Sequence, residues 1–170
     1  MLEDGYGSFA DFVAARQGAL LRTAVLISGD EHLAQDLVQD ALVKLALRWD
    51  RIGGDRPEAY VRTILLRDLI SWRRRYRWER LGVDADLPEG DPSGSSDDRV
   101  VLRAALARLT RKQRAVLVLR FLEDLSEHQT ADLLGVTVGT VKSQTHAALA
   151  RLRILAPELT RPIEQGGHRD

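Results

Sequence analysis

The residues with the clearest chemical meaning lie in segment 126–153, which reads SEHQTADLLGVTVGTVKSQTHAALARLR. Ser126 begins a capping box, a pattern in which a serine and a glutamine three residues later close a helix N-terminus. Gly135 favours a left-handed helix end, and Thr137 is suited to cap a second helix. Two helices joined by a tight glycine turn are typical of a helix-turn-helix, whose second helix usually enters the major groove of DNA.

The second helix of this motif is predicted to have two different faces. Its apolar residues share one face, which indicates a packed side, at positions Val141, Ala148, Leu152 and Leu155. The opposite side is small or polar, so it can approach a DNA groove closely. An ordinary helical hairpin with a solvated face is the alternative interpretation. The candidate DNA-binding residues are Gly139, Thr140, Lys142, Ser143, Gln144 and His146.

A second candidate segment, residues 71–81, reads SWRRRYRWERL and joins arginines to aromatic residues. Arginine binds phosphate, and tryptophan or tyrosine can stack on bases once a strand is unpaired. Trp72 and Tyr76 are four residues apart and therefore share a helical face. An arginine run alone would be interpreted as a solvated face beside core aromatics. Because a helix-turn-helix lies on the same chain, this segment indicates contact with nucleic acid.

The charge of the chain is zero overall but unevenly distributed. Residues 61–80 contain seven arginines against two acids, and residues 99–156 contain ten basic residues against four acids. Residues 81–98 contain six acids and no base. Because salt screens charges beyond about 8–10 Å, the two basic blocks can bind phosphates while acidic segments face elsewhere. The zero net charge therefore does not exclude a nucleic-acid partner.

The composition also narrows the function classes. The chain has no cysteine, which excludes disulfides and cysteine-ligated zinc and suits a reducing cytoplasm. Its four histidines lack the spacing of metal ligands, so we expect no metal and no other cofactor. We expect no membrane span, because no apolar run is long enough, and no signal peptide. An enzyme acting on nucleic acid is disfavoured, because the clustered acids lack rigid support and no glycine-rich phosphate loop is present.

The pattern along the chain predicts an all-α fold of two small helical domains. Caps at Ser8 and Asp30 begin two helices, and a third runs from Glu58 to Trp78 or Arg80. Glycine, proline, serine and aspartate in residues 82–98 predict a flexible acidic linker. The predicted parts are a domain over residues 1–81, the linker 82–98, a domain over 99–156 with helices at 99–109 and after Thr110, and a loose tail at 157–170.

The second helix contains the segment DLVQDALVKLALRW, residues 36–49, which combines an apolar stripe with acidic positions. Glu31, Asp36 and Asp40 form the acidic rim. Acidic side chains suit docking on a basic protein surface better than binding to DNA. The alternative is an amphipathic helix that only packs within its own domain.

The order of four segments resembles that of bacterial sigma factors of the extracytoplasmic-function (ECF) group. The segments are DLVQDALVKLALRW, PEAYVRTILLRDLISWRRR, the acidic linker, and a helix-turn-helix that contains LGVTVGTVKSQ and ALARLR. The resemblance covers residues 8–155, and the pattern YVR…ISW in the third helix is similar to an actinobacterial SigE-like subgroup. It implies a sigma region 2 helical bundle followed by a sigma region 4 helix-turn-helix.

This resemblance implies a promoter-recognition subunit of RNA polymerase, present once per holoenzyme and monomeric when free, not an enzyme. The last domain would read the −35 element of promoter DNA. The first domain would dock on core RNA polymerase and read the melted −10 element, with a flipped base beside the loop Arg51–Pro57. Members of the group often have an anti-sigma partner. The implied −10 residues are Arg67, Ser71, Trp72, Arg73, Arg74 and Arg75. The implied docking residues are Asp36, Leu37, Gln39, Asp40 and Trp49.

Three positions depart from the pattern of the group. Arg67 stands where the group commonly has asparagine, and Gln144 stands where many relatives have a basic residue. Ala147 stands where arginine is usual, so the resemblance implies that one phosphate or base contact of the recognition helix is absent here. A helix-turn-helix regulator that binds a palindromic operator as a dimer is the competing function.

Overall fold

The computed structural model describes residues 6–53, 55–76 and 97–157, and every secondary-structure element within these ranges is helical. This confirms the predicted all-α class. The chain divides into two compact units, unit 1 (Met1–Gly82) and unit 2 (Val83–Asp170). Most of the predicted linker and the tail after Pro157 lie outside the described residues, so the predicted domain bounds stay a prediction. None of the described helices combines the length and apolar character that a membrane span requires.

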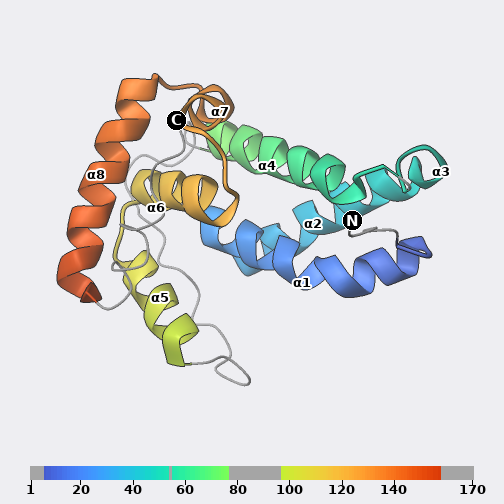
Figure 1. Cartoon of the computed structure of the whole chain (residues 1–170), viewed down its shortest axis with the longest axis horizontal. Coiled ribbons are helices and arrows are strands. Elements are labelled where there is room, and N and C mark those ends of the chain that lie inside the picture. Colours follow the sequence, from blue (N-terminus) through green and yellow to red (C-terminus); the bar gives the residue numbers. More distant parts are fainter. Residues whose placement is uncertain (1–5, 54, 77–96, 158–170) are drawn as a thin grey trace. The chain divides into compact units, whose positions relative to one another are not determined.

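Unit 1 is built from three long helices and one short one. Helices α1, α2 and α4 pack against one another, and the short helix α3 leads from α2 into α4 (Figure 1). Their bounds are α1 (Phe9–Ser28), α2 (Glu31–Ala46), α3 (Trp49–Ile52) and α4 (Pro57–Tyr76).

The ends of α1 and α2 follow the predicted caps. The Ser8 hydroxyl accepts a hydrogen bond from the Asp11 amide at 3.2 Å, which closes the first turn of α1. Gly29 ends α1 in the left-handed conformation, with a φ of 72° that a side chain would disfavour. The Asp30 carboxylate then accepts from the Leu33 amide at 3.0 Å and starts α2. Two helices are thus joined by a connection of two residues.

The core of unit 1 lies where α1, α2 and α4 face one another. Phe12, Ala24 and Ile27 of α1 are buried. On α2, Ala34 and Val38 are buried, and Leu33 and Leu37 are only half-buried. Ala34, Val38 and Leu42 follow one another at intervals of four residues, so they share one face of α2. The other buried apolar residues of α2 and α4 are Ala41, Leu42, Leu45, Val61, Leu65, Leu66, Leu69 and Ile70.

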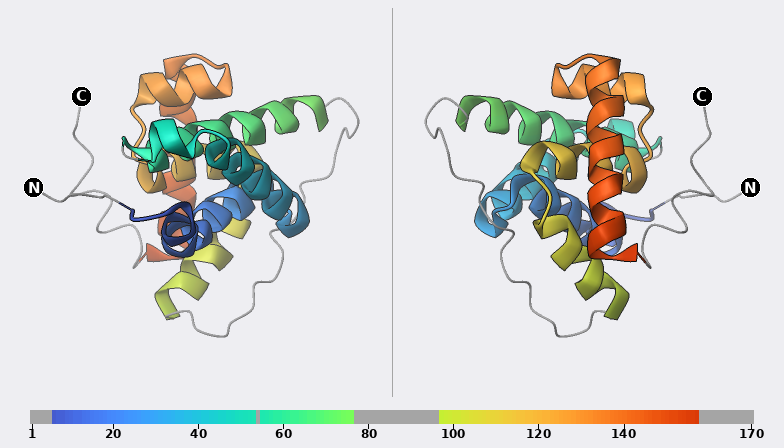
Figure 2. Two further views of the ribbon diagram at one scale, coloured as in Figure 1. Left: turned by 90° about the vertical axis from the view of Figure 1, so that its right-hand side faces the viewer. Right: turned by 90° about the vertical axis from the view of Figure 1, so that its left-hand side faces the viewer.

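Unit 2 is organised around its last helix. Helix α8 contacts α6 and α7 extensively and α5 less, with α7 near one end and α5 near the other (Figure 2). The elements are α5 (Asp97–Ala107), α6 (Arg111–Leu117), the π-helical turn η1 (Val118–Leu122), α7 (Glu127–Leu134) and α8 (Val138–Leu155).

Helix α6 ends in a π-helical turn that the sequence did not predict. Its start is as predicted, since Thr110 and Gln113 exchange both hydrogen bonds of a capping box. The helix then widens into η1, where the Glu123 amide donates to the Val118 carbonyl, five residues back, at 2.9 Å. Asp124 follows in the left-handed region, with a φ of 51°. A wide turn and one left-handed residue thus end the helix and turn the chain toward α7.

Candidate nucleic-acid interface

The first helix of the helix-turn-helix is capped at both ends. The Ser126 hydroxyl accepts from the Gln129 amide at 3.1 Å, and the Gln129 side chain accepts from the Ser126 amide at 2.8 Å. At the other end Gly135 adopts a φ of 66°, and the Val136 amide donates to the Ala131 carbonyl at 3.0 Å. The predicted capping box and glycine cap are both confirmed, so the turn between α7 and α8 has one defined geometry.

The second helix starts at a threonine cap. The Thr137 hydroxyl accepts from the Thr140 amide at 3.1 Å, and the two threonine hydroxyls lie 2.9 Å apart. Ser143 donates its hydroxyl to the Thr140 carbonyl at 3.0 Å. Thr140 and Ser143 were both predicted to contact DNA. The Thr140 hydroxyl already has a partner in the N-cap Thr137 and the Ser143 hydroxyl has one within α8, but a hydroxyl keeps acceptor capacity for a further bond.

Buried side chains hold α8 against the rest of the motif. Val141 of α8, Val116 of α6 and Ala131 of α7 form one buried cluster, and Leu134 and Val138 pack against it. Farther along α8, Ala148 and Leu152 are buried as predicted, and Leu155 is half-buried. Because one face of α8 is committed to this packing, the other face is presented outward in a fixed orientation.

The outward face of α8 contains the candidate DNA-binding residues. Gln144 differs from the others because it is half-buried. The remaining five are exposed, and an added Cβ at Gly139 would meet only the Thr137 hydroxyl, at 3.8 Å. This surface therefore consists of small or polar side chains and is open to solvent. The exposed candidates are Gly139, Thr140, Lys142, Ser143 and His146.

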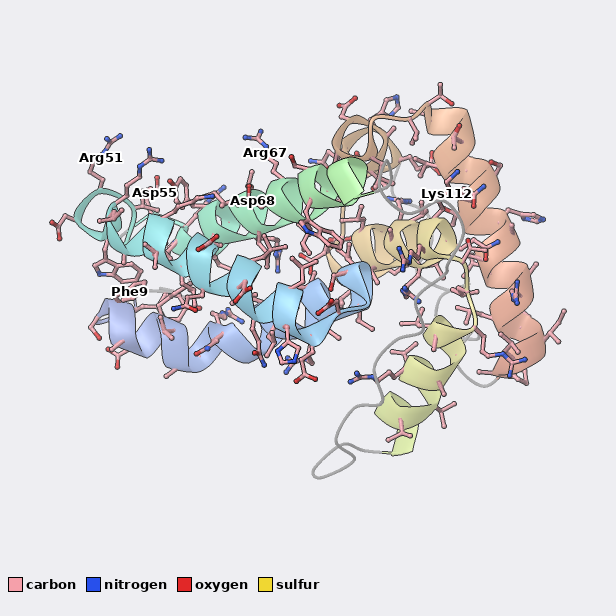
Figure 3. All side chains as sticks on the ribbon, turned by 180° about the vertical axis from the view of Figure 1, so that it is seen from behind. Phe9, Arg51, Asp55, Arg67, Asp68 and Lys112 are labelled. Atoms are coloured by element: carbon pink, nitrogen blue, oxygen red, sulfur yellow. The ribbon has the colours of Figure 1, made fainter. Side chains whose placement is uncertain are left out.

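Unit 1 presents a second set of cationic side chains. Arg51 near the end of α3 and Arg67 of α4 are exposed, and their side chains project from the same side of the unit, away from α1 (Figure 3). Ser71 and Trp72 on α4 are half-buried. The predicted contact residues Arg73, Arg74 and Arg75 continue α4, but their side chains lie outside the described residues.

The predicted docking residues fall into two groups. Asp36, Gln39 and Asp40 are exposed on α2, and Leu37 is half-buried beside them. Trp49 is separate from this face, since it begins α3 and its ring lies 5.4 Å from the ring of Phe9, centroid to centroid. The structure thus brings four of the five residues together on α2 and places the fifth against α1.

Both units match parts of one known family. Residues 12–79 match sigma-70 region 2, and residues 99–152 match sigma-70 region 4. The chain is 42% identical over 149 residues to the RNA polymerase sigma-E factor of Streptomyces avermitilis, covering 85% of this chain and 83% of that protein. This chain belongs to the sigma-70 family of RNA polymerase sigma factors. The resemblance seen in the sequence is confirmed.

Further relatives place this sigma factor in the ECF group. It is 33% identical over 150 residues to the ECF RNA polymerase sigma factor SigL of Mycobacterium tuberculosis, covering 82% of this chain and 84% of that protein. Among solved structures, the sigma factor RpoE of Bartonella quintana, crystallised with the anti-sigma factor NepR, is 27% identical. That match covers 88% of this chain and 97% of the other, with a TM-score of 0.60.

Two features of the sigma factor were not predicted. The Lys142 ammonium lies 3.5 Å from the Glu127 carboxylate, so the recognition helix is linked to the first turn of α7 by an ion pair. On α2, Val43 is 51% exposed, and Leu47 just after the helix is 82% exposed. The apolar spacing of α2 was the available signal, because these two residues continue it onto the side that carries Asp40.

A groove adds to this apolar surface. It has a volume of about 480 Å³ and lies between α1 and α2. Phe9, Val13 and Leu21 line it from α1, and Gln39 and Val43 are among the residues that line it from α2. The acidic face of α2 that is predicted to dock is therefore bordered by an apolar depression.

Proposed function

We propose that this sigma factor directs promoter-specific initiation by reading two DNA elements with its two units while α2 docks on core RNA polymerase. The observation that supports this most strongly is the recognition helix α8. Its inward face is buried, and its outward face carries small or polar side chains that are exposed. A helix held in this way can enter the major groove and read base edges without rearranging.

For the −35 element, the outward face of α8 is the reader. Lys142 and His146 are one helical turn apart, so both can reach edges or phosphates along the same groove. Gly139 and Ser143 allow the backbone to approach closely. Lys142 is the only cation among the six candidate residues when histidine is neutral, so we expect weak binding by this unit alone.

For the −10 element, unit 1 binds the unpaired strand. Arg51 and Arg67 project from one side of the unit and mark a cationic path for its phosphates (Figure 3). Trp72 lies farther along α4, where its ring can stack on an unpaired base. In this proposal the chain makes no covalent change to the DNA. It favours the open strand over the duplex, because only the open strand gains these contacts, and melting becomes less costly.

For docking, α2 offers an acidic and partly apolar surface. Asp36 and Asp40 are exposed, and neither forms an ion pair with any of the described residues. With Val43 and Leu47 beside them, they suit a partner surface that is basic at its rim and apolar at its centre. Docking on core polymerase places the sigma factor in the cytoplasm, on the nucleoid when it is in the holoenzyme.

The proposed function is tested by transcription with purified core polymerase on a genomic promoter library. We expect a stable complex and initiation from a defined set of promoters that share both elements. Failure to bind core polymerase would rule the proposal out. A footprint on a palindromic site without polymerase would instead favour a dimeric helix-turn-helix regulator.

By likeness to RpoE, which was crystallised with NepR, we also propose that an anti-sigma factor binds this chain. Such a partner would hold the sigma factor away from core polymerase until a signal releases it. Purification of the tagged protein from its native cell, followed by identification of stoichiometric partners other than polymerase subunits, tests this.

Replacing Lys142 by alanine should weaken promoter binding by the holoenzyme by about 1–3 kcal/mol, because one cation that reaches the groove is lost. The loss should be confined to promoters with an intact −35 element if Lys142 contacts a base. Affinity is measured on promoters that differ only at −35. Lys112→Ala is the matched control, since Lys112 is exposed in the first turn of α6, outside the helix-turn-helix. Equal effects of the two substitutions would remove Lys142 from the interface.

Replacing Glu127 by glutamine should strengthen nonspecific binding of the holoenzyme to DNA. The substitution removes the carboxylate 3.5 Å from the Lys142 ammonium while keeping the shape of the side chain. The freed ammonium gains phosphate contacts on any sequence, so we expect tighter binding to random duplex DNA and a steeper salt dependence. Binding of the isolated holoenzyme to random duplex at several salt concentrations measures this, and an unchanged salt slope would contradict it.

A further inference from the structure

Aromatic packing against α1 holds the short helix α3 in place. The Trp49 ring lies 5.4 Å from the Phe9 ring at an interplanar angle of 72°, and 5.8 Å from the buried Phe12 ring. Tyr6 packs edge-on against Phe12 with ring centroids 4.9 Å apart. The edge-to-face contact with Phe9 is directional, so it fixes the orientation of the Trp49 ring.

The chain after Trp49 is in turn packed against its ring. Gly53 is buried, and its amide donates to the Trp49 carbonyl at 2.7 Å. A Cβ added at Gly53 would lie 2.6 Å from Trp49 Cε2 and 2.8 Å from the Trp49 carbonyl oxygen, both too close for any side chain. Only glycine therefore permits this approach. The Asp55 amide donates to the Ile52 carbonyl at 2.8 Å, which continues the tight turn.

The other side of the turn is braced as well. Arg16 of α1 lies 2.9 Å from the carboxylate of Glu58 in the first turn of α4 and donates to the Tyr6 hydroxyl at 2.5 Å. Arg48, just before α3, donates to the hydroxyl of Tyr60 on α4. The turn from α3 into α4 is thus held at its start by Trp49 and at its end by Glu58 and Tyr60.

We propose that Trp49 is a positioning residue for −10 recognition, which sets the placement of Arg51 and Asp55 through its contacts with Phe9 and Gly53. This inference rests on the proposed reading of the −10 strand by unit 1. Arg51 and Asp55 are exposed at this turn, whereas Trp49 is half-buried between α1 and Gly53. Trp49 therefore acts on the strand through the turn and is not part of the docking surface on α2.

The test compares Gly53→Ala with Gly18→Ala, which adds the same methyl group to α1 where the nearest atom is the Arg22 guanidinium at 3.5 Å. Holoenzymes are measured for core affinity and for affinity to −10 single strands that differ at one base. We expect Gly53→Ala to reduce discrimination between bases at least tenfold while core affinity stays within twofold. Gly18→Ala should change neither. Unchanged discrimination, or an equal loss of core affinity, would overturn the proposal.

A second variant keeps the proposal testable if Gly53→Ala fails to fold. Phe9→Leu removes one ring from Trp49 and leaves the turn sequence intact. In the free protein, we expect hydrogen exchange of the Gly53 amide to accelerate about tenfold, with the Leu33 amide of α2 unchanged. No acceleration would overturn the positioning role. This measurement needs neither polymerase nor DNA, so it separates failure of the positioning role from failure of −10 reading, which wild-type holoenzyme would show by ignoring base identity.

Discussion

Replacing both Asp36 and Asp40 by lysine is expected to lower the affinity for core RNA polymerase about a hundredfold, or roughly 3 kcal/mol. The two carboxylates are exposed one turn apart on α2. If the partner surface is basic, as their charge suggests, reversal juxtaposes like charges in addition to removing two attractions. Affinity is measured by competition between variant and wild type for purified core polymerase. Because both side chains are on the surface, unit 1 should keep its melting temperature within a few degrees.

The matched control for this reversal is Glu31→Lys. The sequence grouped Glu31 with Asp36 and Asp40, but it lies in the first turn of α2 and, five residues from Asp36, on a different face of the helix. Glu31→Lys also replaces a negative charge by a positive one, and it should cost at most about 1 kcal/mol of helix stability. Core affinity should stay close to wild type. If Glu31→Lys weakened docking as much per charge as the double variant, net charge and not the α2 face would govern binding.

Replacing Val141 by aspartate is expected to unfold unit 2 under conditions where unit 1 remains folded. Val141 is fully buried in the cluster with Val116 and Ala131. An aspartate there would place a carboxylate among apolar side chains, which costs about 3–5 kcal/mol or more. That cost is comparable to the whole stability of a domain of this size. Circular dichroism should show loss of part of the helical signal, and −35 recognition should disappear with core docking retained.

Ala147→Asp is the control for the Val141 substitution. Ala147 lies on the same helix but is exposed, so the same carboxylate would remain in water. We expect only the difference in helix propensity, about 0.5–1 kcal/mol, and a folded unit 2. Similar unfolding by both variants would mean that α8 is sensitive to any charge and that burial of Val141 is not the cause.

The helix ends and the faces of single helices could be predicted from the sequence alone. Ser8, Asp30, Thr110, Ser126 and Thr137 all cap helices as predicted, because a capping hydroxyl or carboxylate acts on amides two or three residues away. The outward face of α8 followed from the periodicity of its buried face in the same way. These features depend on short sequence separations, so their pattern is visible along the chain.

Features that depend on distant residues could not be predicted in this way. The ion pair between Glu127 and Lys142 joins two helices, and no spacing rule links residues fifteen positions apart. The family resemblance grouped Trp49 with the docking residues of α2, but Trp49 begins α3 and packs against Phe9 and Phe12.

The caps of unit 2 have a practical consequence for purification and binding experiments. Thr110, Ser126 and Thr137 hold α6, α7 and α8 with neutral hydroxyls, so these helix ends do not depend on ionic interactions. Phosphate binding by Lys142, in contrast, weakens as salt rises. We therefore expect moderate salt to elute the protein from DNA without unfolding it. Over the same range of salt concentrations, the fraction of protein bound to DNA should fall while the melting temperature stays nearly constant.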